Sequence, residues 1–245
     1  MMSQKAPLLA IILVGLIFSG CASMKADPSA GAGFVPMQEM AQKSDLPFNK
    51  AWVKDGMEWK NYQTIYIKPV NTAYMMETET WKQNFRQGRM KEDAQELARY
   101  MEDRFRSAFA TSQDNQFRAV GYPEPGSLTL EMALTELVPS NVALEILGYG
   151  PYGSGTVIKL LSRSSGAVTT VAFEAKVRDS KTGTVVAMFA DREIQKYKFL
   201  DFKGFTWYGN ARNIIDDWAD QMVQVANKRP GQVVEAASTF SLKRW

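Results

Sequence analysis

The 245 residues are 45% hydrophobic and 22% charged, which allows a sizeable core, and the net charge of +3 is too small to indicate a nucleic-acid partner. The chain contains no histidine and one cysteine, Cys21, which excludes histidine-dependent catalysis, imidazole metal ligands and an internal disulfide. We therefore expect a folded protein that has no cofactor, no metal and no nucleic-acid partner.

The first 20 residues have the order of regions that is typical of a secretory signal peptide. Lys5 adds positive charge to a short polar start, residues 6–18 are almost entirely apolar, and Ser19 and Gly20 are small. At 13 residues, the apolar run is shorter than the roughly 20 residues that a membrane-spanning helix needs. We therefore predict cleavage directly before Cys21.

The predicted cleavage site, Phe18-Ser19-Gly20-Cys21, resembles the lipobox of bacterial lipoproteins, although Phe18 replaces the usual leucine. The resemblance implies that Cys21 is the lipid-attachment residue and carries several acyl chains, such as palmitate, because stable anchoring needs more than one. Aspartate after the cysteine tends to retain such proteins at the inner membrane. This chain has Ala22 there, which implies the outer membrane and its periplasmic face. The alternative is an ordinary secretory signal with an incidental cysteine.

Residues 22–33, rich in Ala, Gly and Ser, predict a flexible tether, and residues 34–59 predict an irregular lead-in that packs onto the domain. Beyond them, β-rich runs predict strands, and apolar residues at three- and four-residue spacing predict helices. The predicted elements are strands over 62–70, 116–120, 127–138, 168–178 and 184–193, and helices over 88–110 and 211–228, the second with Asn210 as N-cap.

The order of these elements contains no repeated parallel βαβ unit. It predicts an α+β fold in one domain, with a mostly antiparallel sheet of about five strands and two helices packed on one face. The 127–138 strand alternates and predicts one buried and one exposed face, and the polar run over 179–183 predicts a hairpin turn. The predicted organisation is a signal peptide over 1–20, a lipidated tether and lead-in over 21–60, the domain over 61–229 and a C-terminal tail over 230–245.

The insert over 141–166 is rich in glycine and aliphatic residues. Its run from Gly148 to Gly153 has the spacing GxGxxG, but a dinucleotide site also needs a βαβ unit, and Pro151 interrupts the loop. Two interpretations remain: a glycine hinge before a short helix that packs on the sheet, or a contact surface for a membrane or partner. The residues of this candidate interaction loop are Tyr149, Gly150, Tyr152 and Gly153.

Side chains with catalytic potential have simpler explanations. Asp216 and Asp217 are adjacent on the second predicted helix, where Asp217 and Asp220 share a face. Paired carboxylates can serve acid–base or metal chemistry, but a solvated helix face accounts for them. Arg178 and Asp179 fit ordinary turn chemistry. An aromatic cluster after the last strand indicates core or interface packing and comprises Phe199, Phe202, Phe205, Trp207 and Tyr208. We therefore assign no catalytic residue.

Four segments of the sequence resemble the same known protein family. They are the strand over 62–70, the G-S-L-T-L strand from Gly126 with its T-E-L-V-P-S segment, the hairpin E-A-K-V-R-D-S-K-T-G over 174–183, and Asp217-Trp218-Ala219. Together they resemble the bacterial lipoprotein family catalogued as domain of unknown function 3313, and the hairpin is the most specific part. The resemblance covers most of the mature chain. It implies a lipid anchor and a single domain, and it brings no catalytic residues.

These observations predict a non-enzymatic binding or structural lipoprotein of the bacterial envelope, with a protein or glycan partner. The alternative is a carboxylate-based hydrolase or a small-ligand-binding protein of the periplasm, because glycosidases that use an acid pair need no histidine. Two inward-facing carboxylates in one cleft would favour the hydrolase.

Overall fold

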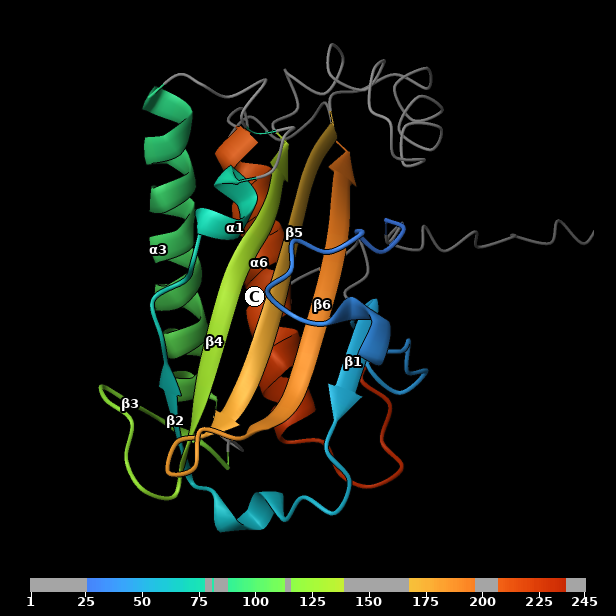
Figure 1. Cartoon of the computed structure of the whole chain (residues 1–245), viewed down its shortest axis with the longest axis vertical. Helices are drawn as coiled ribbons and strands as arrows, with labels where there is room; N and C mark the ends of the chain where they lie inside the picture. Colours follow the sequence, from blue (N-terminus) through green and yellow to red (C-terminus); the bar gives the residue numbers. More distant parts are fainter. Residues whose placement is uncertain are drawn as a thin grey trace, which may run out of the picture.

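The computed structural model describes residues 26–77, 81, 88–112, 116–138, 168–196 and 207–236. Within them, six strands form one sheet in the order β1-β6-β5-β4-β2-β3 (Figure 1). The strands are β1 (Lys50–Val53), β2 (Thr64–Ile67), β3 (Arg118–Val120), β4 (Ser127–Val138), β5 (Val168–Asp179) and β6 (Val185–Lys196). The helices are α1 (Ala73–Met76), α3 (Gly88–Thr111) and α6 (Trp207–Ala226), with 3-10 turns η1 (Met37–Glu39) and η2 (Trp59–Asn61).

The sheet is mixed because β2 runs parallel to both of its neighbours, β3 and β4, whereas the other three pairs are antiparallel. The helical crossover through α3 allows this, since it returns the chain to the end of the sheet from which β2 started. The predicted single α+β domain is confirmed. The mostly antiparallel sheet of about five strands is corrected to a mixed sheet of six, and β1 lies in the stretch predicted to be irregular.

The helices α3 and α6 cover one face of the sheet, and the main core lies between them and the strands (Figure 1). The predicted inward face of β4 is confirmed, and its residues are at most 3% exposed: Leu128, Leu130, Met132 and Leu134. A bulge between Leu134 and Glu136 shifts the register, so Leu137 returns to the same core. The main core therefore extends along the whole length of β4.

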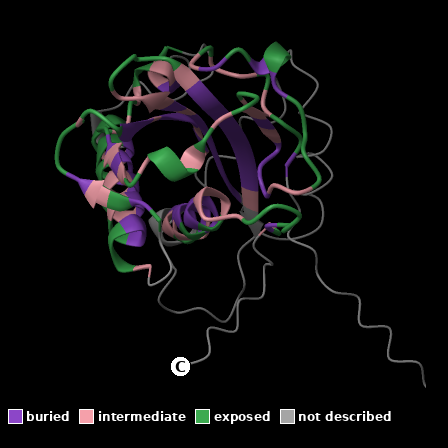
Figure 2. Ribbon diagram, turned by 90° about the horizontal axis from the view of Figure 1, so that it is seen from below, coloured by how far each residue is buried: buried purple, intermediate pink, exposed green. Residues whose placement is uncertain are grey.

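The opposite face of β4 is also covered, so the prediction of a half-exposed strand is wrong. Thr129, Ala133 and Thr135 are buried. Residues 26–41, here called the strap, cross this face of the sheet in front of β5 and β6 (Figure 1). Figure 2 shows the buried strands as a purple band between the helices and the outer segments. The strap and β6 form a second, smaller core from Val35, Met37, Met40, Met188 and Ala190.

Local predictions at the element ends had mixed outcomes. The hairpin is confirmed: Asp179 Oδ1 accepts the N–H groups of Lys181 and Thr182, and Gly183 has a φ of 70°. The helix α6 begins at Trp207, so Asn210 lies inside it and is not the N-cap. A capping side chain is only a local signal, and the helix extends one turn beyond it.

Within the described residues, no helix combines the length and apolar character needed to cross a bilayer.

Candidate functional site

Most residues that carry functional predictions lie outside the described part of the chain. They include Cys21, the candidate interaction loop of Tyr149, Gly150, Tyr152 and Gly153, and the aromatic residues over 199–205. Their roles stay predictions. The structure defines three other features: the contacts that hold the chain from Ala26 onward, the bonding partners of the carboxylates, and the position of a surface hollow.

The strap is bound to the sheet through Glu174 in the middle of β5. This side chain is 0% exposed, and its two oxygens accept hydrogen bonds from the backbone N–H groups of Ala32, at 2.6 Å, and Val35, at 2.7 Å. Hydrogen bonds to a charged acceptor are stronger than neutral ones. Gly31 and Gly33, with φ of 88° and 87°, supply the left-handed backbone that turns the strap at this point. A specific pair of bonds therefore fixes the strap, in addition to apolar contact.

Ala26, the first described residue, is tied to the domain by a second, buried network. Asn49 donates from Nδ2 to the carbonyl of Ala26 at 3.3 Å and accepts at Oδ1 from the N–H of Arg192 at 2.8 Å. The Asn49 N–H donates to Asp191 Oδ1 at 2.8 Å, and Trp218 Nε1 donates to Asp191 Oδ2 at 2.9 Å. The point where the chain joins the domain is therefore connected to β6 and, through Trp218, to α6.

Only residues 22–25 separate Cys21 from this network. The five residue steps from Cys21 to Ala26 span at most roughly 17 Å of extended chain, so a lipid on Cys21 would hold the domain close to the bilayer. The composition of residues 22–33 predicts a flexible tether, but within the described part of this range Ala26 is only 4% exposed and Ala32 is hydrogen-bonded. The prediction fails because Glu174 lies 142 residues away from Ala32, and local composition carries no signal of so distant a partner.

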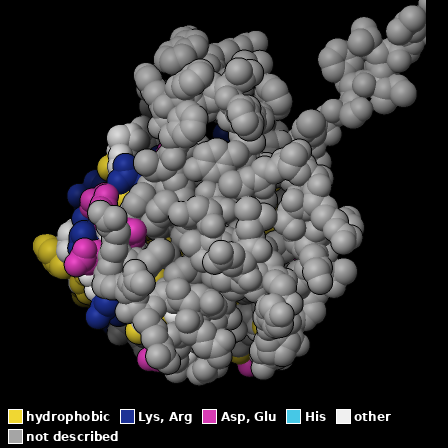
Figure 3. All heavy atoms as spheres, turned by 90° about the horizontal axis from the view of Figure 1, so that it is seen from above, with side chains coloured by type: hydrophobic (Ala, Val, Ile, Leu, Met, Phe, Trp, Pro, Cys, Tyr) yellow, Lys and Arg dark blue, Asp and Glu magenta, His cyan; other side chains and the backbone are white. Residues whose placement is uncertain are grey.

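The acidic residues of α6 bind α3. Arg104 Nε donates to Asp216 at 3.0 Å, and its Nη2 donates to Asp220 at 2.5 Å. The Tyr100 hydroxyl donates to Asp216 at 2.7 Å, and burial together with this hydrogen bond raises the pKa of Tyr100 to about 12. Figure 3 shows basic and acidic side chains side by side on the flank where α3 lies. The solvated-face interpretation is therefore corrected for Asp216, which is partly buried and joins the two helices, whereas Asp220 also contacts α3 but stays 51% exposed.

Carboxylates on the strap side of the sheet are also paired with cations. Glu131 accepts hydrogen bonds from Lys68 at 2.8 Å and Arg178 at 2.9 Å. Burial alone would raise the pKa of Glu131, but these two cations outweigh burial and lower it. Glu136 binds Arg192 through both oxygens, at 2.7 and 2.8 Å. These acids therefore stabilise the sheet, and Arg178 connects neighbouring strands in addition to its turn contact with the Gly183 carbonyl.

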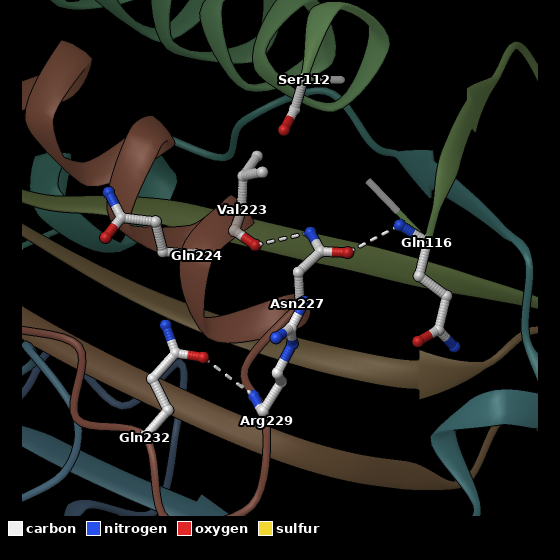
Figure 4. A pocket seen from close by; sticks show the side chains of 7 residues that line it. All are labelled: Ser112, Gln116, Val223, Gln224, Asn227, Arg229 and Gln232. Carbon is white, nitrogen blue, oxygen red and sulfur yellow. Dashed lines mark hydrogen bonds between the residues drawn. The ribbon is translucent and has the colours of Figure 1, made fainter. Parts of the chain in front are cut away.

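A hollow lies where the ends of α3 and α6 meet the start of β3 (Figure 4). Its volume is about 770 Å³. Four of the side chains around it are carboxamides, and none of the described lining residues is a carboxylate. The lining consists of Ser112, Gln116, Val223, Gln224, Asn227, Arg229 and Gln232.

Hydrogen bonds hold three of these carboxamides in place. Gln116 Nε2 donates to two backbone carbonyls beside η2, at 2.8 and 3.2 Å. Asn227 Oδ1 accepts the Gln116 N–H at 2.6 Å, and its Nδ2 donates to the Val223 carbonyl at 2.7 Å. Gln232 Oε1 accepts the Arg229 N–H at 3.0 Å. Three of the four carboxamides of the lining are therefore fixed by hydrogen bonds to the backbone.

The described residues give the hydrolase alternative no support. They contain no group of three or more His, Cys, Asp or Glu side chains that could hold a metal ion. The hollow also lacks the pair of carboxylates that such a hydrolase requires. No sequence pattern marks the hollow, because its described residues come from separate segments between Ser112 and Gln232, and isolated Gln and Asn side chains form no motif.

Comparison with known proteins identifies one family. The sequence profile of the family described as "Protein of unknown function (DUF3313)" matches residues 32–222. No curated protein matches the chain.

Several solved structures are distantly similar. The PelC dodecamer from Paraburkholderia phytofirmans is 11% identical with a TM-score of 0.35, over 70% of this chain and 95% of that one. A predicted lipoprotein from Caulobacter crescentus CB15 is 9% identical with a TM-score of 0.36, over 69% and 89%. A DUF330 protein from Xanthomonas campestris is 15% identical with a TM-score of 0.41, over 66% and 81%. At these values, none of the three bears on the function of this chain.

Proposed function

Because this chain belongs to the DUF3313 family of proteins of unknown function, we propose a role from its own residues. It is a lipid-anchored protein of the bacterial cell envelope that binds or supports another envelope component and catalyses no reaction. Cys21 carries the lipid, and Ala22 directs the protein to the outer membrane, where it faces the periplasm.

The position at which the chain joins the domain carries this proposal. The predicted signal peptide ends at residue 20, and the bonds of Asn49 and Glu174 hold the chain from Ala26 onward. A lipid on Cys21 therefore needs only the short span over 22–25 to connect to the folded domain. This arrangement suits a domain that works at the membrane surface.

The use of the carboxylates supports a role without catalysis. Glu131, Glu136 and Asp216 each have a cationic partner, and Glu174 binds the strap backbone. Each of these contacts joins two elements of the fold. General acid–base chemistry needs a carboxyl group that can reach a bound substrate, and these groups are committed to structure.

Cys21→Ser tests the anchor. The variant lacks the thiol that receives the diacylglycerol, so we expect it to leave the membrane fraction or to remain uncleaved, and to incorporate no labelled fatty acid. Metabolic labelling with a palmitate analogue, followed by immunoprecipitation and membrane fractionation, measures both effects. Ser23→Ala is the matched control, because it changes a small residue two positions away without touching the thiol, and it should be labelled like the wild type. A wild-type chain without labelled lipid would contradict the proposal.

Ala22→Asp tests the assignment to the outer membrane. By the lipobox resemblance, an aspartate directly after the acylated cysteine retains the protein at the inner membrane. We expect the wild type in the outer-membrane fraction of a sucrose gradient, and the variant in the inner-membrane fraction with its lipid intact. Ala22→Ser is the control and should fractionate like the wild type. Wild-type protein in the inner membrane would overturn the assignment.

A further inference from the structure

We propose that the hollow between the ends of α3 and α6 binds a neutral glycan that carries hydroxyl and N-acetyl groups. The inference rests on the proposed binding role and names its ligand class. The volume of the hollow, about 770 Å³, lies within the range of roughly 300–1,000 Å³ typical of small-molecule sites. Such sites are mostly apolar, whereas six of the seven side chains here are polar, so a hydroxyl-rich ligand fits this lining better than an apolar one.

The hydrogen-bonding groups of the lining match those of a sugar. A carboxamide offers both donors and acceptors, and so does a hydroxyl group, so each can pair with the other in either direction. Bonds to neighbouring backbone use both donors of Gln116 Nε2 and one lone pair of Gln232 Oε1, which leaves Gln116 Oε1 as an acceptor and Gln232 Nε2 as a donor. Gln224 is exposed and adds a further carboxamide. Donors and acceptors therefore surround the same space.

The charge of the described lining favours a neutral ligand. Arg229 is its only charged side chain among the described residues, so none of the described side chains of the lining would hold a cation. The hollow also lies at the C-terminal ends of α3 and α6, where the helix dipoles disfavour a strongly anionic ligand.

Hydrogen bonds link the hollow to the hairpin end of the sheet. Gln116 bonds to the Tyr62 carbonyl, and the Tyr62 hydroxyl bonds to Asp179 at the hairpin end of the sheet. The chain joins the domain beside Arg192, seven residues along β6 from its first residue, Val185. Seven strand residues span roughly 23 Å, so the hairpin end of β6 lies well away from the point where the chain joins the domain.

The test uses the mature lipidated chain in phospholipid nanodiscs, without glycoside detergents that could occupy the site. The probe is chitotetraose, a neutral chain of N-acetylated sugars, and binding is measured by saturation-transfer NMR and titration calorimetry. We expect binding, and we expect Gln224→Ala and Arg229→Ala each to weaken it roughly tenfold, the loss typical of one hydrogen bond. Both residues are exposed, so the variants should fold. Gln42→Ala and Arg99→Ala remove the same groups from exposed sites outside the hollow and should bind like the wild type.

Three results would overturn the inference. One is the absence of saturation transfer from chitotetraose to the wild type. Another is equal binding by the wild type and the double variant of Gln224 and Arg229, which would locate the ligand elsewhere. The last is binding of inorganic phosphate that displaces chitotetraose, which would make Arg229 part of an anion site. Fatty-acid labelling of Cys21 tests the anchor separately, so none of these results affects that part of the proposed function.

Discussion

Leu130→Asp is expected to abolish folding of the domain. Leu130 is 0% exposed and lies between Ile67 of β2 and Val177 of β5 in the middle of the sheet. The main core around it consists of apolar side chains, and an unpaired buried charge costs roughly 3–5 kcal/mol in addition to the lost leucine contacts. Since whole domains are stable by only about 5–15 kcal/mol, we expect little folded protein, measured by soluble yield and circular dichroism.

Tyr122→Asp is the control for this variant. Tyr122 is 67% exposed in the loop between β3 and β4, so the same new charge stays in water. We expect its melting curve to match the wild type, because exposed substitutions change stability by about 0.5 kcal/mol or less. Wild-type melting of Leu130→Asp would show that the faces of β4 are assigned wrongly.

Glu174→Ala is expected to release the strap while the rest of the sheet stays folded. The variant loses both hydrogen bonds to the strap backbone, at a cost of roughly 2–4 kcal/mol. The main core between the sheet and the helices contains no residue of the strap, so it should persist. Hydrogen exchange measured by mass spectrometry should show fast exchange at Ala32 and Val35 and wild-type protection in β4 and α3.

Glu39→Ala is the matched control for the release of the strap. Glu39 lies on the strap within η1 and is exposed, so this change removes the same type of side chain without removing a bond to the sheet. Its strap amides should exchange at the wild-type rate. Unchanged protection of Ala32 and Val35 in Glu174→Ala would mean that apolar packing alone holds the strap.

The elements with long periodic patterns could be predicted from sequence. The helix α3 starts at the predicted residue and ends one residue beyond the predicted end, and β4 has the predicted bounds, because their apolar residues recur at helical and strand periods. The strand β1 was missed because four residues are too few to show a period. Parallel pairing of β2 was missed because pairing depends on where α3 returns the chain, which a local pattern does not encode.

Most of the candidate site could not be predicted, because it too depends on contacts between residues that are far apart in the sequence. Glu174 was part of a recognised hairpin motif, but its partners are backbone N–H groups more than 130 residues away, and backbone groups leave no mark in a sequence. The hollow depends on how α3, α6 and the segment after α6 end near one another. The role of Cys21, in contrast, stays a prediction that depends only on a four-residue context, because a signal sequence is read by enzymes as an extended chain and not as a fold.

The mass of the intact chain, extracted from membranes and purified, tests the central claim most directly. A lipid-anchored protein that begins at Cys21 should lack residues 1–20 and carry the added mass of a diacylglycerol and a further acyl chain, and fragmentation should locate this mass on the N-terminal residue. A chain that retains residues 1–20, or one cleaved there without lipid, would contradict the claim that this domain is held at the membrane through Cys21.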